Sequence, residues 1–140
     1  MKKIAVLLSL FSFTLFFSQE SQNYVRISYS SICCGTPSAE PVMSYLDQFQ
    51  KKNRIRSFEV YRESGLGREG EFNLYIGTDK LSKRQKSNFI KGLKDAVSSQ
   101  NAKRNRKNAG TVNFDETVVV TKADLSNVKN LTVYKNNLIK

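Results

Sequence analysis

The segment 24–31 alternates between apolar and polar residues, with Val25, Ile27 and Tyr29 on one face. A period of two residues is typical of a half-buried β-strand. Segments 57–63 and 71–77 alternate in the same way, and the glycine-rich linker 64–70 between them predicts a β-hairpin. Segment 112–121 predicts another strand, bent at Asp115-Glu116, and segment 131–134 predicts a last edge strand.

Two other segments repeat their apolar residues at helical spacing. Segment 37–53 carries prolines near its start and then an apolar face, so we expect a helix there. Ser82-Lys83-Arg84-Gln85 is a capping box, and it opens a second helix. The apolar face of that helix is formed by Phe89, Ile90, Leu93 and Val97. Segment 101–110 is polar, basic and rich in turn-forming residues, which predicts a loop.

The predicted order is β-α-β-β-α-β followed by a tail with strand character. This order predicts an α+β fold with the split, ferredoxin-like arrangement, in which an antiparallel sheet carries two helices on one face. We find no internal repeat. Residues 19–140 therefore read as a single domain, with an ordered core over about 23–121 and a C-terminal tail over 122–140.

The start of the chain indicates export. Lys2 and Lys3 precede an apolar run from Ile4 to Phe17, which is the n-region and h-region pattern of a secretory signal peptide ending near Ser18. The run is shorter than the ~20 residues that a membrane-spanning helix needs. No cysteine precedes Cys33, so a lipoprotein anchor is not expected. We predict a periplasmic or extracellular protein.

The charge balance indicates acidic partners. The 140 residues carry a net charge of +11, and loss of Lys2 and Lys3 with the signal peptide lowers it to +9. Such a surface suits an acidic protein or an anionic glycan or lipid, although basic residues also serve solubility alone. The basic loop at 103–107 has no core to face, so we predict the anion contacts there: Lys103, Arg104, Arg106 and Lys107.

The chain contains no histidine, which excludes serine and cysteine triads and histidine-bearing zinc sites within it. We therefore predict a protein that is not an enzyme. The string Gly65–Gly70 has the form G-x-G-x-x-G, but a second strand follows it where a dinucleotide site needs a helix. We interpret it as a hairpin turn and expect no dinucleotide. Tyr24, Tyr61 and Tyr75 fall on the open sheet face, yet no RNA-recognition signature is present, and we expect no RNA.

Cys33 and Cys34 are the only cysteines, and they are adjacent in the loop between the first strand and the first helix. Adjacent Cα atoms lie ~3.8 Å apart, closer than in ordinary disulfides, so a structural staple is not expected. Four interpretations stay open. The pair binds Cu(I) or another thiophilic metal, forms a redox-active or ligand-gripping vicinal disulfide, bridges two chains into a dimer, or is buried as small apolar residues.

The segment Ser30-Ser31-Ile32-Cys33-Cys34-Gly35 resembles, by its position, the metal loop of ferredoxin-like heavy-metal-binding domains and copper chaperones. Those families use Cys-x-x-Cys, and this chain departs from that spacing. The resemblance implies soft-metal binding at the pair, with Met43 as a candidate third ligand. From the sequence we expect an exported, non-enzymatic binding module with a metal or redox dithiol site; the alternative is a basic interaction protein that contacts an anionic surface.

Overall fold

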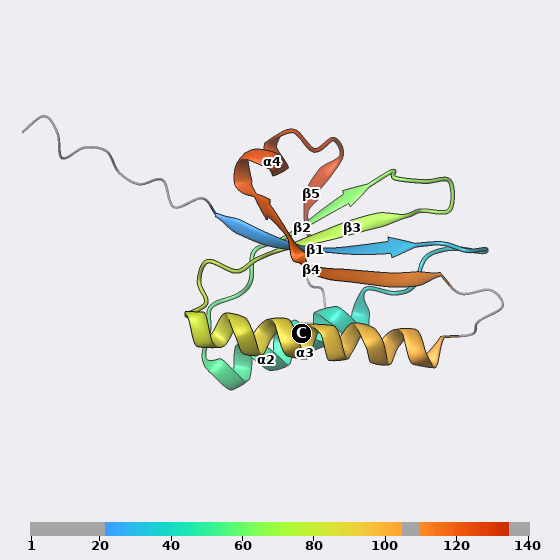
Figure 1. Cartoon of the computed structure of the whole chain (residues 1–140). Coiled ribbons are helices and arrows are strands. Elements are labelled where there is room, and N and C mark those ends of the chain that lie inside the picture. Colours follow the sequence, from blue (N-terminus) through green and yellow to red (C-terminus); the bar gives the residue numbers. More distant parts are fainter. Residues whose placement is uncertain (1–21, 105–109, 135–140) are drawn as a thin grey trace, which may run out of the picture.

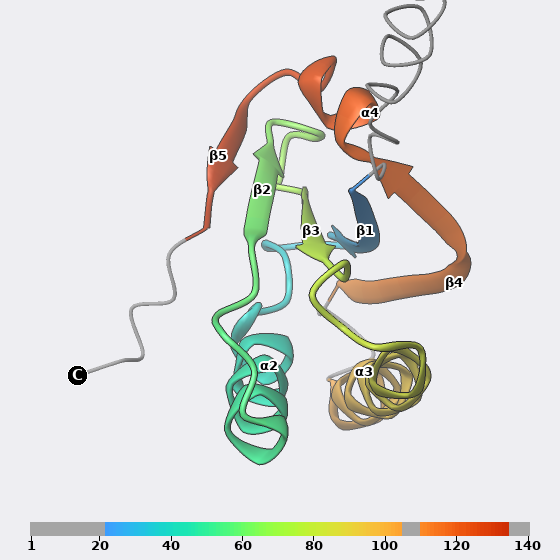
Figure 2. The same ribbon diagram turned by 90° about the vertical axis from the view of Figure 1, so that its left-hand side faces the viewer.

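The computed structural model describes residues 22–104 and 110–134, which form one antiparallel sheet with helices on both faces. The strands are β1 (Asn23–Ser30), β2 (Val60–Ser64), β3 (Phe72–Gly77), β4 (Thr111–Thr121) and β5 (Leu131–Val133). The helices are α2 (Glu40–Asn53), α3 (Lys83–Lys103) and α4 (Lys122–Ser126). The strand order is β4-β1-β3-β2-β5. Helices α2 and α3 lie under one face, and α4 lies over the other (Figures 1 and 2).

The predicted α+β class is confirmed, and the strand order does not conflict with the split topology. Strand β1 is an interior strand, next to the β4 edge, and pairs with β3 on one side and β4 on the other. The hairpin of β2 and β3 forms around the glycine-rich linker, as predicted. Strand β2 begins at Val60 rather than at residue 57, because its pairing with β3 starts with Val60 opposite Ile76. Phe58 packs against the core from outside the strand.

Helix α3 begins as predicted. The Ser82 hydroxyl accepts from the Gln85 backbone N–H at 3.3 Å, and the Gln85 side chain accepts from the Ser82 N–H at 2.9 Å. The prediction that a loop starts at residue 101 was wrong for its first three residues, because α3 continues to Lys103. The Asn101 side chain holds this last turn to β4, donating to the Val112 carbonyl at 2.7 Å and accepting from the Val112 N–H at 3.0 Å.

Helix α2 begins at Glu40, three residues after the predicted start. The Ser38 hydroxyl accepts from the Glu40 N–H at 3.1 Å. The Ser38 carbonyl accepts instead from the Gln100 side chain at 2.7 Å. These contacts hold residues 37–39 outside the helix, and Pro41 occupies the first turn, where its missing N–H has no cost.

Strand β4 is one element with an irregularity where the bend was predicted. Val25 pairs with Val119, whereas Ile27 pairs with Phe114, so β4 holds extra residues between those two pairs. The Asp115 carboxylate accepts there from both the N–H and the hydroxyl of Thr117. After the strand, Thr121 and Asp124 form a capping box that opens α4, a helix that we did not predict.

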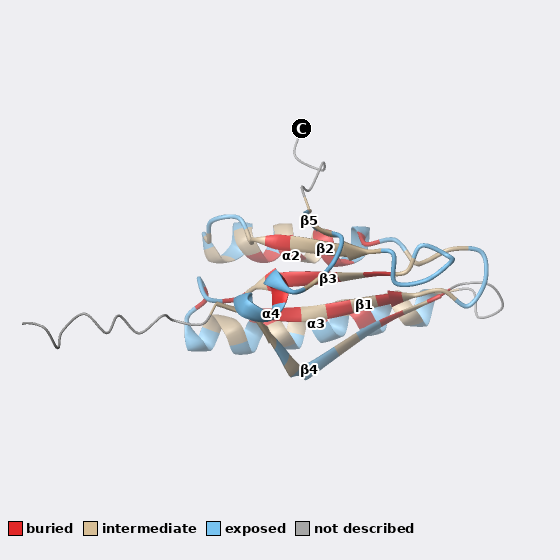
Figure 3. Cartoon of the chain, turned by 90° about the horizontal axis from the view of Figure 1, so that it is seen from above, coloured by how far each residue is buried: buried red, intermediate tan, exposed pale blue. Residues whose placement is uncertain are grey.

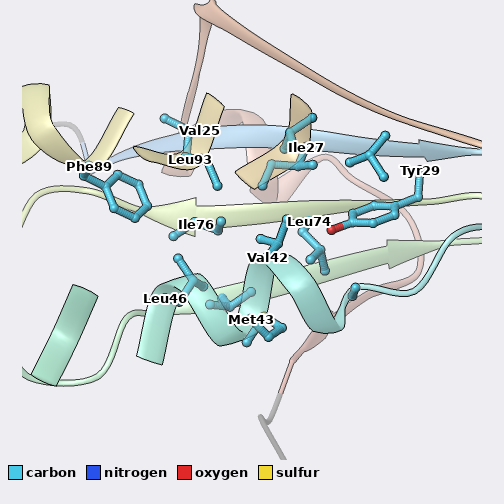
Figure 4. Close-up of a cluster of buried hydrophobic side chains, with 14 of the residues drawn as sticks. Val25, Ile27, Tyr29, Val42, Met43, Leu46, Leu74, Ile76, Phe89 and Leu93 are labelled. Atoms are coloured by element: carbon cyan, nitrogen blue, oxygen red, sulfur yellow. The ribbon is translucent and has the colours of Figure 1, made fainter. Parts of the chain in front are cut away.

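The core lies between the sheet and the pair α2 and α3 (Figures 3 and 4). Ile27, Leu74 and Ile76 point into it from the sheet and are fully buried. Leu46 from α2, and Phe89 and Leu93 from α3, meet them from the other side. Full burial of such a side chain contributes about 1.5–3 kcal/mol. The apolar face of β1 and the apolar faces of both helices are thus buried together in one layer.

Candidate functional site at the loop end of the sheet

The strand register brings three connections to one end of the sheet. Ser30 lies opposite Thr111, and Phe72 lies opposite both Tyr29 and Ser64. The β1–α2 loop, the β2–β3 hairpin and the start of β4 therefore emerge together, as Figures 1 and 3 show. We call this the loop end, comprising the described residues 31–39, 65–71, 103–104 and 110.

Cys33 and Cys34 form a disulfide with each other in the exposed part of the β1–α2 loop. Their Cα atoms lie 3.8 Å apart. Cys34 has φ 71°, a left-handed conformation that is uncommon outside glycine and that gathers at functional sites. Of the four interpretations, the structure contains the vicinal disulfide. Burial as small apolar residues is wrong, since both side chains are exposed, and dimerisation through the pair stays a prediction.

Contacts other than the disulfide hold the loop on both sides. The Ser31 hydroxyl donates to the Gly35 carbonyl at 3.0 Å. Gln100 donates to the Ser38 carbonyl from α3. Gly110 approaches so closely that a Cβ there would collide with the Ser30 carbonyl and would lie 2.9 Å from Pro37. Opening the disulfide would therefore leave the ends of the loop in place.

The candidate third metal ligand is elsewhere. Met43 is 4% exposed and packs in the core beside Val42 and Leu46 (Figure 4), so it is not available to the exposed cysteines. Over residues 22–104 and 110–134, no group of three or more His, Cys, Asp or Glu side chains is arranged to hold a metal ion. Within these ranges, Cys33 and Cys34 are therefore not part of a larger cluster of such ligands.

Two of the four predicted anion-contact residues fall in the described part of the chain. Lys103 is the last residue of α3, and Arg104 is its C-cap, whose N–H donates to the Asn101 carbonyl at 3.4 Å. Both line a groove of about 580 Å³ between α2 and α3. Pro37 from the β1–α2 loop lines the same groove, so the two candidate sites adjoin. Arg106 and Lys107 lie outside the described residues, as does the predicted signal peptide.

Sequence reasoning missed this groove. It depends on Gly92, where a Cβ would lie 2.5 Å from the hydroxyl oxygen of Tyr45. Without that Cβ, the Tyr45 ring lies across α3, and its hydroxyl donates to the Phe89 carbonyl at 2.8 Å. Gly92 and Ala96, four residues apart on α3, were the available signal.

The outer sheet face is not an open aromatic platform. Tyr24 and Tyr75 are 1% and 4% exposed because Leu125 of α4 packs against them. Tyr24 and Tyr61 donate to Glu59 at 2.8 and 2.6 Å. The hydrogen bond from Tyr61 is the main cause that lowers the pKa of Glu59, with a further contribution from Tyr24. Burial, followed by the hydrogen bond to Glu63, raises the pKa of Tyr75 to about 12.

No helix in the described part of the chain is both long enough and apolar enough to cross a membrane. No protein-family model matches this chain, and neither the curated proteins nor the solved structures contain a significant match.

Proposed function

We propose that this chain is an exported, non-enzymatic binding module in which Cys33-Cys34 is a reversible disulfide that changes the surface of the loop end. The supporting observation is an exposed disulfide in a loop that other contacts already anchor. A disulfide stabilises chiefly by closing a loop in the unfolded chain, and one between neighbouring residues encloses none. Its role is then chemical rather than structural.

The proposed exchange is a two-electron step. A thiolate of an external dithiol attacks one sulfur, the bond between Cys33 and Cys34 breaks, and a mixed disulfide forms. The second thiolate of the dithiol then releases the chain. Both cysteines leave as thiols with two protons, and the dithiol becomes a disulfide. The reduced pair presents two soft sulfur ligands in the exposed part of the β1–α2 loop, which suits Cu(I).

Intact-mass spectrometry with alkylation tests this proposal. Protein purified without reductant should be two hydrogens lighter than its sequence predicts and should take no iodoacetamide. After reduction it should take two alkyl groups and should bind one Cu(I) in competition with a chelator. The variant Cys33→Ser/Cys34→Ser is the matched control and should do neither. A native protein whose thiols are free and unreactive would contradict the proposal, and a covalent dimer would indicate the intermolecular bridge instead.

A second candidate function is contact with an anionic surface. It is supported by Lys103 and Arg104, which both line the groove beside the disulfide loop. Retention on heparin or on anionic lipid should fall when four residues are replaced by glutamine: Lys103, Arg104, Arg106 and Lys107. Unchanged retention would reject this segment as the contact.

A further inference from the structure

A second depression continues the groove between α2 and α3 along the helix pair. It has a volume of about 480 Å³ and shares Tyr45, Gln48 and Gly92 with the first. The two helices run antiparallel (Figure 1), so the groove extends from Lys103 at the loop end to Asn88 and Lys52 at the other end. We call both parts together the helix groove. Fifteen residues of α3 separate Asn88 from Lys103, which corresponds to about 22 Å at ~1.5 Å per residue.

The charges along the helix groove have one sign. Lys52 lines one end, Lys103 and Arg104 line the other, and no carboxylate lines either part among the described residues. Asp95 acts on the groove-lining Tyr45, where its charge adds to the effect of burial in raising the pKa of the Tyr45 hydroxyl to about 12. An occupant that spans the groove should therefore be anionic at both ends.

The uncharged lining favours a peptide. Its apolar part comes from Pro37, Pro41 and Ala96. Its amide groups come from Gln48, Asn88 and Gln100, and amides pair well with peptide N–H and C=O groups. The Gln100 Oε1 atom is buried and has no hydrogen-bond partner within the described part of the chain, while its Nε2 donates to the Ser38 carbonyl. A peptide N–H in the groove would satisfy this acceptor.

Among the described residues, the cations that line the helix groove stand at its two ends, whereas its middle is uncharged, and an extended peptide with separated carboxylates matches that spacing. We propose that the helix groove binds an extended acidic segment of a partner protein, about seven residues long at ~3.3 Å per residue. This inference rests on the proposed binding role and names the partner's chemistry. Carboxylates of the segment would meet the cations at the two ends, and its apolar side chains would lie on the prolines and Ala96 between them.

Fluorescence anisotropy with a labelled synthetic peptide tests the inference. The probe is an end-capped peptide of eight residues that alternates glutamate with leucine or phenylalanine, and the same peptide with lysine for glutamate is its control. Saturable binding of the glutamate peptide is expected. Lys52→Gln/Lys103→Gln/Arg104→Gln should weaken it about tenfold or more, as expected for lost charge pairs. The matched variant Lys83→Gln/Arg84→Gln/Lys91→Gln removes equal charge from exposed positions and should change it less than about twofold.

Ala96→Trp adds an obstruction without changing charge, and it should also abolish binding while circular dichroism stays unchanged. Peptide-induced NMR shifts should centre on Tyr45, Gly92 and Gln100. Equal losses in the two charge variants would overturn the groove inference and leave only attraction by net charge. A heparin octasaccharide or anionic vesicles that bind through these residues, where the peptide does not, would also overturn it while leaving the second candidate function intact.

Discussion

The layer between the sheet and helices α2 and α3 differs from the loop end in what holds it together. Ile27, Leu74 and Leu93 in the layer are completely buried. At the loop end, Ile32 and Leu66 are 58% and 48% exposed, and the disulfide lies at the surface. Apart from the buried Ala39, the loop end is held by a few hydrogen bonds and a close backbone approach instead of by apolar burial. Most of the packing that stabilises the fold therefore lies in the layer. We expect changes at the loop end, including a change in the state of the disulfide, to affect stability less.

The largest expected effect lies in the layer. Leu93→Ala removes a fully buried side chain from α3 and leaves a cavity, so it should lower the free energy of unfolding by about 2–5 kcal/mol. Urea denaturation monitored by circular dichroism measures the loss. Lys91→Ala on the exposed face of the same helix is the control and should change stability by less than about 0.5 kcal/mol. A loss below about 1 kcal/mol for Leu93→Ala would remove the contrast between the two regions.

Alkaline pH is expected to have the second largest effect, a loss of stability of the layer. Burial raises the pKa of Tyr29 and Tyr45 above the ordinary value of 10.0, in Tyr45 to about 12. A raised pKa in the folded state means that the neutral tyrosines contribute stability below pH 10, and that this stability is lost as the pH rises through about 12. Unfolding midpoints measured from about pH 9 to about pH 12 should fall progressively.

Tyr29→Phe separates this effect from general alkaline damage. The Tyr29 hydroxyl is buried and has no hydrogen-bond partner among the described residues, so its removal breaks no bond that the structure shows. The variant should keep its stability near neutral pH and lose less of it in alkali. A slope identical to that of the parent protein would assign the alkaline loss to other groups.

Local patterns predicted the elements whose cause is local. The period of two in β1 and the Ser82 and Gln85 capping box of α3 were confirmed, because each depends on neighbours within one segment. Thr121 and Asp124 form the same kind of box, but α4 has five residues and one buried side chain, too few to repeat a helical period.

Long-range contacts explain the remaining differences. The late start of α2 depends on Gln100, which contacts Ser38 across 62 positions of the chain. The helix groove requires Gly92 to lie against Tyr45, and only the packing of the two helices brings them together. The adjacency of Cys33 and Cys34 made that site visible in the sequence, yet the sequence left four chemistries open for it, and the structure contains one of them.

The smallest expected effect lies in the disulfide itself. Cys33→Ser/Cys34→Ser should change the free energy of unfolding by less than about 0.5 kcal/mol, because the bond joins neighbours at an exposed site and restricts no loop of the unfolded chain. Reduction of the parent protein should have the same small effect in urea denaturation, with thiol labelling to verify that the bond is open. If either change cost about 2 kcal/mol or more, as loss of a structural disulfide does, the loop end would belong to the stabilising region and the case for a reversible disulfide there would fail.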